Sequence, residues 1–318
     1  MLRMSSTLKN LGNTCYINSI IHCLKDLILE QEDNINDTRE LSTKLYTLCE
    51  AIKEYDGVIS PITFVKQVKA LYPKYNNTSQ HDAHEFFMDL LDTLHEENKR
   101  SRIMYNPYGH TLHKESNKAW IDCVKQNSFI SKNIFGQIIR TYKCRECEHT
   151  FNNYERYNTL DTIPHVSVKE SLNRYFNFND IVYIACDNCG KPERQQEHSV
   201  ITKIIRPSQL LFILFKNKPK NNEIDIPLEL DISDFSLNTE DGRSYTYTLK
   251  SLVCHVGLHP EVGHYYNVHV GDDNICVGDE EVQNKEVTFT IYNDNQKFTS
   301  NKYDKSHVYM MMYVRKLN

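Results

Sequence analysis

Cys15 lies where a cysteine could act as a nucleophile. It follows Gly12-Asn13-Thr14 and begins a run of apolar residues at helical spacing, so it falls in the first turn of a predicted helix. The unpaired amides and the helix dipole there favour a thiolate, the reactive form of cysteine. Asn10 or Asn13 could donate a side-chain amide to an oxyanion. The alternative is a buried cysteine that only opens an amphipathic helix, and helix position alone favours that alternative.

His264, in the run Gly263-His264-Tyr265-Tyr266, is the candidate base for that thiol. A cysteine protease needs a histidine that takes the thiol proton and protonates the leaving amine, and an Asp or Asn that orients the ring. Asp272, Asp273 and Asp279 follow in the sequence and supply candidates for the third group. Because the chain has 14 histidines, any one of them is more often a surface or core residue.

Two Cys-x-x-Cys pairs, Cys144/Cys147 and Cys186/Cys189, could supply four thiolates to one tetrahedral zinc ion. The long segment between the pairs suggests that they lie at the ends of separate hairpins. A redox pair or coincidence is the alternative, but two pairs of matched spacing favour a metal. A site closed by four cysteines leaves no position for water, so such a zinc would stabilise the fold and would not catalyse.

A third polar cluster extends from Gln80 to Phe86. His81, Asp82, His84 and Glu85 together could suggest a metal site, but the helical metal motif His-Glu-x-x-His is not present. Asp82 also suits the cap of a helix, and this alternative is nearly as well supported as a functional role.

Composition excludes several classes of protein. The 318 residues are 40% hydrophobic and 25% charged, which is ordinary for a globular protein. A net charge of -5 argues against a nucleic-acid-binding surface. The longest apolar run, Val308–Val314, is far shorter than the ~20 residues of a membrane helix.

The first ten residues contain no continuous apolar stretch, so we expect no secretory signal and an intracellular protein, in the cytoplasm or the nucleus. In those compartments the ten cysteines suggest metal binding or catalysis and not disulfides. Abundant Asn and scarce Gly fit an AT-rich eukaryotic genome or a virus of a eukaryotic host.

The elements that must position these groups are helices first and strands later. Apolar residues recur at helical spacing after Thr14, a suitable N-cap, and again over 41–55, after Ser60-Pro61, and after a capping box at Ser79–Asp82. Strands are expected at 138–142, 210–215, 245–256, 265–270, 287–292 and 308–314. Residues 98–130 give weak signals, and 217–225 and 293–304 are expected to be polar connections. This order indicates an α+β fold.

Together these stretches resemble the ubiquitin-specific proteases, a family of papain-like deubiquitinating cysteine proteases. In the family's order, Asn10–Ser19 is similar to the Cys box, Gln80–Phe86 to the helix that follows it, the four paired cysteines to the fingers, and 247–270 with Asp279 to the His box. Arg206–Lys216 resembles the strand after the second cysteine pair. The match runs from Leu8 to Val314.

The resemblance implies a single α+β catalytic domain over 1–318, with a helical thumb at about 1–130, fingers with a four-cysteine zinc site at 131–215 and palm strands at 216–318. It implies that Cys15 is the nucleophile, His264 the general base and acid, Asp279 the residue that orients His264, and Asn10 the oxyanion-hole residue in preference to Asn13.

The resemblance also implies that Asp82, His84 and Tyr265 line a channel for the C-terminal tail of ubiquitin. That tail is arginine-rich, so a carboxylate in the channel could pair with it. The loop Gly257–Gly263 matches a loop that covers this channel in the family.

One departure concerns the orienting acid. The family has a Trp, then an aromatic residue followed by two acid or amide residues, whereas Asn274, Val277 and Gly278 stand at those places here. Asp272 and Asp273 therefore stay alternatives to Asp279.

We therefore expect a thiol-dependent deubiquitinase that cleaves after the C-terminal Gly of ubiquitin, carries a structural Zn2+, and has ubiquitin and ubiquitinated proteins as partners. The alternatives are a protease for another ubiquitin-like modifier and a non-catalytic ubiquitin-binding adaptor.

Overall fold

The computed structural model describes residues 6–31, 40–102, 111–177, 180–190, 194–217, 223–237, 245–271 and 287–316. The chain divides into two compact units. Unit 1 comprises Met1–Lys99, Ile213–Phe215 and Leu249–Tyr313, and unit 2 comprises Arg100–Phe212, Lys216–Thr248 and Val314–Asn318. Within the described residues, no helix is long and apolar enough to cross a membrane.

The helices of unit 1 come from the first hundred residues. They are α1 (Cys15–Leu29), α2 (Glu40–Glu54), α3 (Ile62–Leu71) and α4 (Ala83–Glu97), with a 3-10 turn, η2 (Pro73–Tyr75), and a short parallel strand pair, β1 (Thr7–Leu8) and β2 (Val58–Ile59). α1 is buried almost all round, since apolar residues occupy most of its faces, and it contacts α2, α4 and the sheet of unit 1. A helix of this kind forms the core of its unit.

The starts of α4 and α2 are each capped by a carboxylate that accepts a hydrogen bond from a backbone amide of the first turn. Asp82 is the N-cap of α4 and accepts from the backbone N–H of His84 at 2.7 Å. Glu97, the last residue of α4, accepts from the backbone N–H of Ser42 at 2.9 Å and so caps the start of α2. The expected capping box at Ser79 is therefore replaced by a cap at Asp82.

The strands of one sheet that lie wholly or partly in unit 1 have the order β15-β14-β13-β12-β16-β10, with β10 at Leu210–Phe215, β12 at Thr246–His259, β13 at Val262–Val270, β14 at Phe289–Asn293, β15 at Gln296–Ser300 and β16 at Val308–Arg315. In this sheet β12, β13, β14 and β15 pair antiparallel, each with the next. The 3-10 turn η6 (Lys305–His307) precedes β16. α1 contacts β13 and β14. The helix that begins with Cys15 therefore packs directly on the strand that carries His264.

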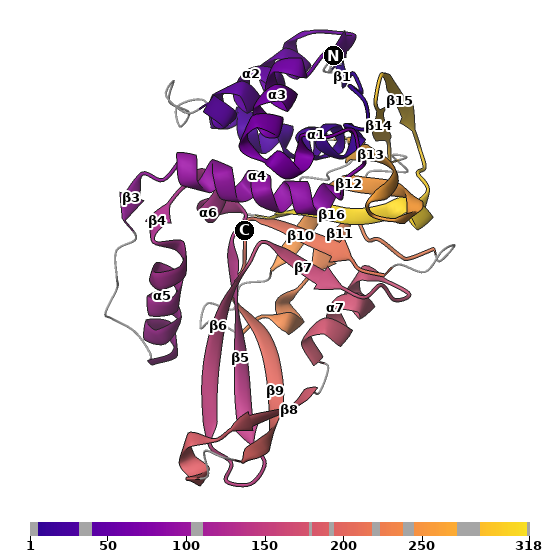
Figure 1. The fold of residues 1–318 in the computed structure, drawn as a ribbon. Helices are drawn as coiled ribbons and strands as arrows, with labels where there is room; N and C mark the ends of the chain where they lie inside the picture. Colours follow the sequence, from indigo (N-terminus) through magenta and orange to yellow (C-terminus); the bar gives the residue numbers. More distant parts are fainter. Residues whose placement is uncertain are drawn as a thin grey trace. The chain divides into compact units, whose positions relative to one another are not determined.

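Unit 2 contains a long four-stranded antiparallel sheet, the finger sheet. Its order is β6-β5-β9-β8, with β5 at Gly136–Cys144, β6 at Thr150–Tyr157, β8 at Asp180–Ala185 and β9 at Gln195–Arg206 (Figure 1). The first four residues of β6 are exposed. The end of the sheet that carries the cysteine pairs therefore has little apolar core of its own.

The remaining elements of unit 2 are α5 (Thr111–Val124), α6 (Phe129–Asn133), α7 (Val168–Asn177), β3 (Ser101–Arg102), β4 (Gln126–Asn127), β7 (Thr159–Thr162), β11 (Glu229–Asp231), η3 (Asp187–Cys189) and η4 (Ser233–Phe235). α6 opens with a capping box between Ser128 and Ser131. α7 packs through Phe176, whose ring stacks on that of Phe235 at 5.2 Å between centroids.

The α+β class is confirmed, and all six predicted strands are present. Residues 98–130, for which the sequence gave weak signals, contain α5 and the start of α6. One expectation is wrong in detail. Residues 293–304, expected to be a polar connection, contain β15, which pairs with β14 over its whole length.

Candidate active site and cysteine cluster

The loop before Cys15 is held by its own side chains. Thr14 is the N-cap residue of α1, yet its Oγ1 accepts from the backbone N–H of Leu11 at 2.9 Å and does not cap the helix. Asn10 Oδ1 accepts from the backbone N–H groups of Gly12 at 3.0 Å and Thr14 at 3.1 Å. This loop fixes the start of α1, where the N–H of Cys15 has no acceptor within the helix.

His264 lies near the start of β13 and forms a side-chain hydrogen bond with Cys15. Its Nε2 lies 2.6 Å from Oδ1 of Asn293, the last residue of β14. Because an amide oxygen only accepts, Nε2 carries the proton, and Nδ1 is the nitrogen left for the thiol. The two ring nitrogens thus have partners from opposite ends of the chain.

The glycine before His264 is required by the close approach of two strands. Gly263 has a φ of +151°, and a Cβ at this position would lie 2.2 Å from the carbonyl oxygen of Val256 on β12. Its N–H donates to Oε1 of Gln80 at 2.6 Å, which ties the segment before α4 to the strand that carries His264. Side chains are disfavoured at such a φ, so only glycine fits here without strain.

The pKa of His264 is raised to about 9, which favours the charged imidazolium. The hydrogen bond with Cys15 is the largest cause, and partial burial opposes it. The hydrogen bond to Asn293 and the charges of Cys15 and Asp294 raise the pKa further. This environment suits an imidazolium beside a thiolate, the resting state of a cysteine protease.

Asp294 joins the loop before Cys15, α1 and His264. Its Oδ2 accepts from Asn10 Nδ2 at 3.0 Å and its Oδ1 from Asn18 Nδ2 at 3.4 Å. Nε2 of His264 lies 3.7 Å from Oδ2. One carboxylate therefore sets the orientation of the Asn10 amide and adds negative charge beside the imidazole.

Of the two asparagines considered as oxyanion donors, the structure brings Asn10 into this group. Asn13 has a left-handed φ of 56° and donates its side-chain amide to the backbone oxygen of Thr78 at 2.6 Å. Its amide thus supports the loop, whereas the amide of Asn10 lies with Asp294 and His264.

Asp272, Asp273 and Asp279, the expected orienting acids, lie outside the described residues. Among the described residues, the group that bonds His264 Nε2 is Asn293, which the sequence analysis did not single out. A signal was present: Tyr292-Asn293-Asp294 is an aromatic residue followed by an amide and an acid, the pattern sought at 277–279.

Asp82 and Tyr265, two of the expected substrate-binding residues, belong to one hydrogen-bonded wall of unit 1. Asp82 Oδ1 caps α4 and also accepts from the hydroxyl of Tyr309 at 2.7 Å. Tyr265 is 3% exposed, and its hydroxyl donates to the backbone oxygen of Pro260 at 2.7 Å. The rings of Tyr265 and Tyr309 meet edge to face at 5.7 Å. His84 lies in the first turn of α4. Their contact with a substrate stays a prediction.

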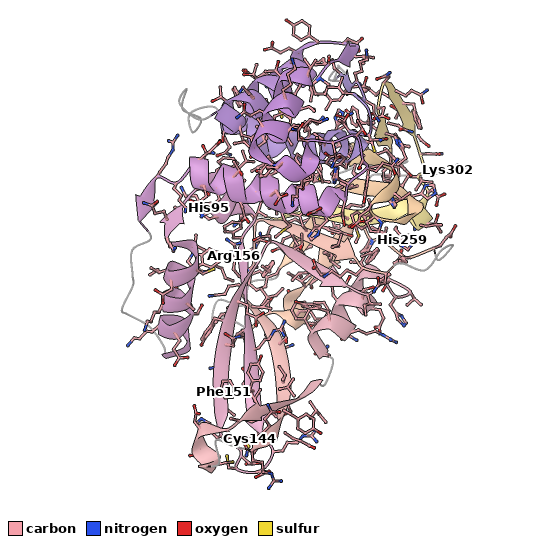
Figure 2. The ribbon with its side chains drawn as sticks, viewed as in Figure 1. His95, Cys144, Phe151, Arg156, His259 and Lys302 are labelled. Atoms are coloured by element: carbon pink, nitrogen blue, oxygen red, sulfur yellow. The ribbon has the colours of Figure 1, made fainter. Side chains whose placement is uncertain are left out.

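The four paired cysteines converge in unit 2, and their sulfur atoms all lie within 4.8 Å of one another. The Sγ atoms are 3.8 Å apart in Cys144 and Cys189, and 3.6 Å apart in Cys147 and Cys186. Four sulfurs at the zinc distance of about 2.3 Å would be about 3.8 Å apart in a tetrahedron. Figure 2 shows Cys144 at the end of the finger sheet, beyond Phe151. The donor set and its spacing fit a metal ion.

The two cysteine pairs lie in similar turns. The residue after each second cysteine is left-handed, Glu148 with a φ of 61° and Gly190 with a φ of 62°. Each pair also closes with a backbone hydrogen bond to the carbonyl of its first cysteine, from the N–H of Glu148 at 2.9 Å and of Cys189 at 3.2 Å. Both turns aim two sulfurs at one point.

The family model that matches this chain and the sequence relatives named below all bear the name ubiquitin carboxyl-terminal hydrolase. The model of the family Ubiquitin carboxyl-terminal hydrolase matches residues 6–313. The chain is 25% identical over 353 residues to ubiquitin carboxyl-terminal hydrolase 4 of Arabidopsis thaliana, covering 96% of this chain and 92% of that protein. It is 26% identical to ubiquitin carboxyl-terminal hydrolase 46 of Caenorhabditis elegans, covering 87% of this chain and 79% of that protein.

Other relatives are longer, and the chain spans only 31% of ubiquitin carboxyl-terminal hydrolase 23 of Arabidopsis thaliana at 22% identity. Among solved structures, the fold is similar to that of the SAGA DUB module Ubp8/Sgf11/Sus1/Sgf73 bound to monoubiquitin, with a TM-score of 0.72 and 15% identity over 100% of this chain and 71% of that chain. The match of the family model over nearly the whole chain confirms the resemblance of the motifs: the chain belongs to the ubiquitin carboxyl-terminal hydrolase family.

Proposed function

We propose that this protein is a deubiquitinase that hydrolyses the peptide or isopeptide bond after the C-terminal Gly of ubiquitin through a thioester on Cys15. The observation that carries the proposal is the arrangement of Cys15, His264 and Asn293, with the hydrogen-bonded His264 between the other two. Membership of the family supplies ubiquitin as the substrate class.

The chemistry follows from the two faces of the His264 ring. His264 Nδ1 takes the thiol proton, and the Cys15 sulfur attacks the carbonyl carbon of the terminal Gly. The imidazolium then gives its proton to the leaving amine as the C–N bond breaks, which leaves a thioester on Cys15. Water, deprotonated by His264, attacks the thioester and releases ubiquitin with a free carboxylate and Cys15 as a thiol.

Two donors are available for the oxyanion that forms in each attack. They are the backbone N–H of Cys15 in the first turn of α1 and the Asn10 side-chain amide, whose orientation Asp294 sets at 3.0 Å. Amides fixed before the reaction stabilise developing charge without a cost of reorientation.

We propose that Asn293, and not Asp279, orients His264. The amide oxygen accepts the Nε2 proton and so selects the tautomer that presents Nδ1 to Cys15. A neutral amide adds no charge of its own, and Asp294 supplies the nearby negative charge. The positioning role and the electrostatic role are thus divided between neighbouring residues.

We further propose that the wall containing Asp82, His84 and Tyr265 binds the arginine-rich tail of the modifier. Asp82 Oδ1 already accepts two hydrogen bonds, from the N–H of His84 and the hydroxyl of Tyr309, which hold the carboxylate in place. A carboxylate fixed in this way could pair with an incoming guanidinium at low entropic cost.

The four cysteines of unit 2 would hold one zinc ion. Four thiolates would neutralise and enclose the ion, so its contribution is to stabilise the fold of the finger sheet and not to act on the substrate. Neither Cys15 nor His264 belongs to this cluster.

A panel of modifiers tests the proposal. The whole protein should hydrolyse an isopeptide-linked ubiquitin substrate faster than substrates that carry other ubiquitin-like modifiers. Preference for another modifier would support the alternative of a protease for that ubiquitin-like modifier. Binding of ubiquitin without turnover of any substrate would support the adaptor.

A further inference from the structure

One face of α1 lies along β14, the strand that ends at Asn293. Asn18, His22 and Lys25 follow Cys15 at intervals of three or four residues, so they lie on one side of the helix. Asn18 donates to Asp294 at 3.4 Å. The ring of His22 stacks on that of Tyr292, with centroids 4.2 Å apart and planes at 16°.

Lys25 adds a third contact from α1 to the same strand. Its Nζ lies 5.2 Å from the centroid of the Tyr292 ring. Both side chains are buried, Lys25 at 9% and Tyr292 at 5% exposure. A cation beside an aromatic face is attracted by the ring quadrupole, more strongly where water is excluded. The tyrosine is thus held by two residues of the helix that carries the nucleophile.

The spacing of the contacts along the helix is compatible with their spacing along the chain at the end of β14. Four residues along a helix, from Asn18 to His22, rise about 6 Å. Asp294 is the turn residue that follows β14 and lies two residues beyond Tyr292, a separation that can span at most about 7 Å. The two contacts therefore fix the position of β14 along α1, and they do so at the residues on either side of Asn293.

The environment of His22 keeps its ring neutral. The ring is 3% exposed, and no described residue hydrogen-bonds its Nδ1. Burial lowers its pKa well below 6.5, and the facing groups Lys25, His269 and Lys297 lower it further. Asp26, the acid of this helix turn, lies 3.8 Å from His269.

An unpaired buried nitrogen is unfavourable, and an aliphatic side chain at position 22 would avoid it. An aliphatic side chain would not stack on Tyr292. The imidazole therefore provides a flat ring at the cost of one unsatisfied atom, which points to a role in placing Tyr292.

We propose that His22 is a positioning residue: by stacking on Tyr292 it holds Asn293 within hydrogen-bond distance of His264. His22 does not contact the reacting atoms in this account, and it acts only through β14. The inference rests on the proposed function for the role of Asn293, but its test does not require ubiquitin to be the substrate.

The test is a double-mutant cycle read by alkylation of Cys15. The rate of carboxamidomethylation of Cys15 by iodoacetamide is measured by peptide mass mapping at pH 7 and at pH 9.5 in the whole protein. The rate at pH 7 divided by the rate at pH 9.5 reports how much of His264 is imidazolium at pH 7, because the imidazolium stabilises the reactive thiolate of Cys15. A fall of the pKa of His264 from about 9 to its ordinary value of about 6.5 would lower the imidazolium fraction at pH 7, and with it this ratio, by roughly fourfold.

We expect His22→Leu to lower the ratio several-fold in the wild-type background and to leave it unchanged in Asn293→Ala, because the residue through which His22 acts is then absent. His22→Phe, which keeps a flat ring, should restore the wild-type ratio. His95→Leu removes another buried histidine of unit 1, 4% exposed on α4, and should leave the ratio unchanged (Figure 2).

Equal effects of His22→Leu in the two backgrounds would overturn the proposal, as would an unchanged ratio in His22→Leu. If His22→Leu does not fold, Tyr292→Leu removes the same stack from the other side and must show the same dependence on Asn293. A protein that fails to cleave ubiquitin while showing this dependence would contradict the proposed function and support the positioning role.

Discussion

The two cysteine groups of this protein are organised in opposite ways. Cys15 is a single thiol in a site that joins the loop before it, at Asn10, to two segments more than 240 residues further along the chain, at His264 and Asn293–Asp294. Packing and hydrogen bonds hold them in place. The cluster of unit 2 has four thiols on two local turns at an end of the finger sheet whose β6 residues are exposed.

The comparison shows two means of fixing a thiol. In unit 1 the packing of the core holds the site in place, since α1 is buried and packs on β13 and β14. In unit 2 the turns supply donors, and an ion would supply the cohesion that packing does not. The first arrangement keeps one sulfur reactive, whereas the second encloses all four.

The largest expected effect comes from the single thiol. Cys15→Ser should lower kcat/KM for a ubiquitin substrate by about 10⁴-fold or more, the scale of losing a nucleophile. It should also lower the pKa of His264 from about 9, because Cys15 is the largest cause of the elevation. Proton NMR titration of the imidazole measures that change. Turnover retained in the variant would move the nucleophile to another cysteine.

The raised pKa of His264 has a consequence for stability. A histidine with a folded-state pKa above its unfolded value stabilises the fold fully below about pH 6.5, and this contribution is lost as pH rises through about 9. The difference in unfolding free energy between wild type and His264→Ala should therefore shrink between these values. Urea unfolding at pH 6 and pH 9.5 measures it, and a difference that grows with pH would contradict the assignment.

The next prediction distinguishes the roles of the neighbouring residues Asn293 and Asp294. Asn293→Ala should lower kcat and move the alkaline limb of kcat/KM below pH 9, because His264 loses its Nε2 partner. Asp294→Ala should lower kcat by about 10²-fold, as expected when an oxyanion donor such as Asn10 loses its support. If Asp279→Ala were the variant that shifts the limb, our assignment of the orienting group would be wrong.

Removing the metal should affect the finger sheet and the Cys15 site differently. Chelation, or Cys186→Ser, should loosen the finger sheet and weaken ubiquitin engagement; a loss of about 1.4 kcal/mol of binding would raise KM about tenfold. Alkylation of Cys15 should stay close to its original rate, since packing within unit 1 holds its site. Equal loss of both readouts would mean that the two regions do not differ as described, and absence of zinc on elemental analysis would remove the metal site.

The last prediction concerns the wall at Asp82. Asp82→Ala should destabilise the protein by about 1 kcal/mol through the lost cap of α4. It should also raise KM, by an amount that corresponds to about 1.5–3 kcal/mol if a tail arginine pairs with the carboxylate. Tyr309→Phe is the matched control, because it removes one hydrogen bond to Asp82 and leaves the cap. Lowered stability with unchanged kinetics would assign Asp82 to capping alone.

The contrast between the regions also explains what the sequence could predict. The cysteine pairs were recognisable because each is a local pattern, and Cys15 and His264 lie in motifs of adjacent residues. Asn293 was missed because its role depends on the pairing of β14 with β13, which brings it to a histidine 29 residues away. A polar segment after a strand gave no periodic signal for β15, so the turn containing Asp294 was read as a connection.

The proposed reaction requires that Cys15, activated by His264, forms a thioester with the C-terminus of ubiquitin. Reaction of the whole protein with ubiquitin that carries a C-terminal vinyl sulfone, followed by intact-mass measurement and peptide mapping, tests this step. We expect one ubiquitin per chain, attached to Cys15, with no adduct in Cys15→Ser and far slower reaction in His264→Ala. An adduct on a different cysteine, or no adduct with ubiquitin and a full one with another modifier, would contradict it.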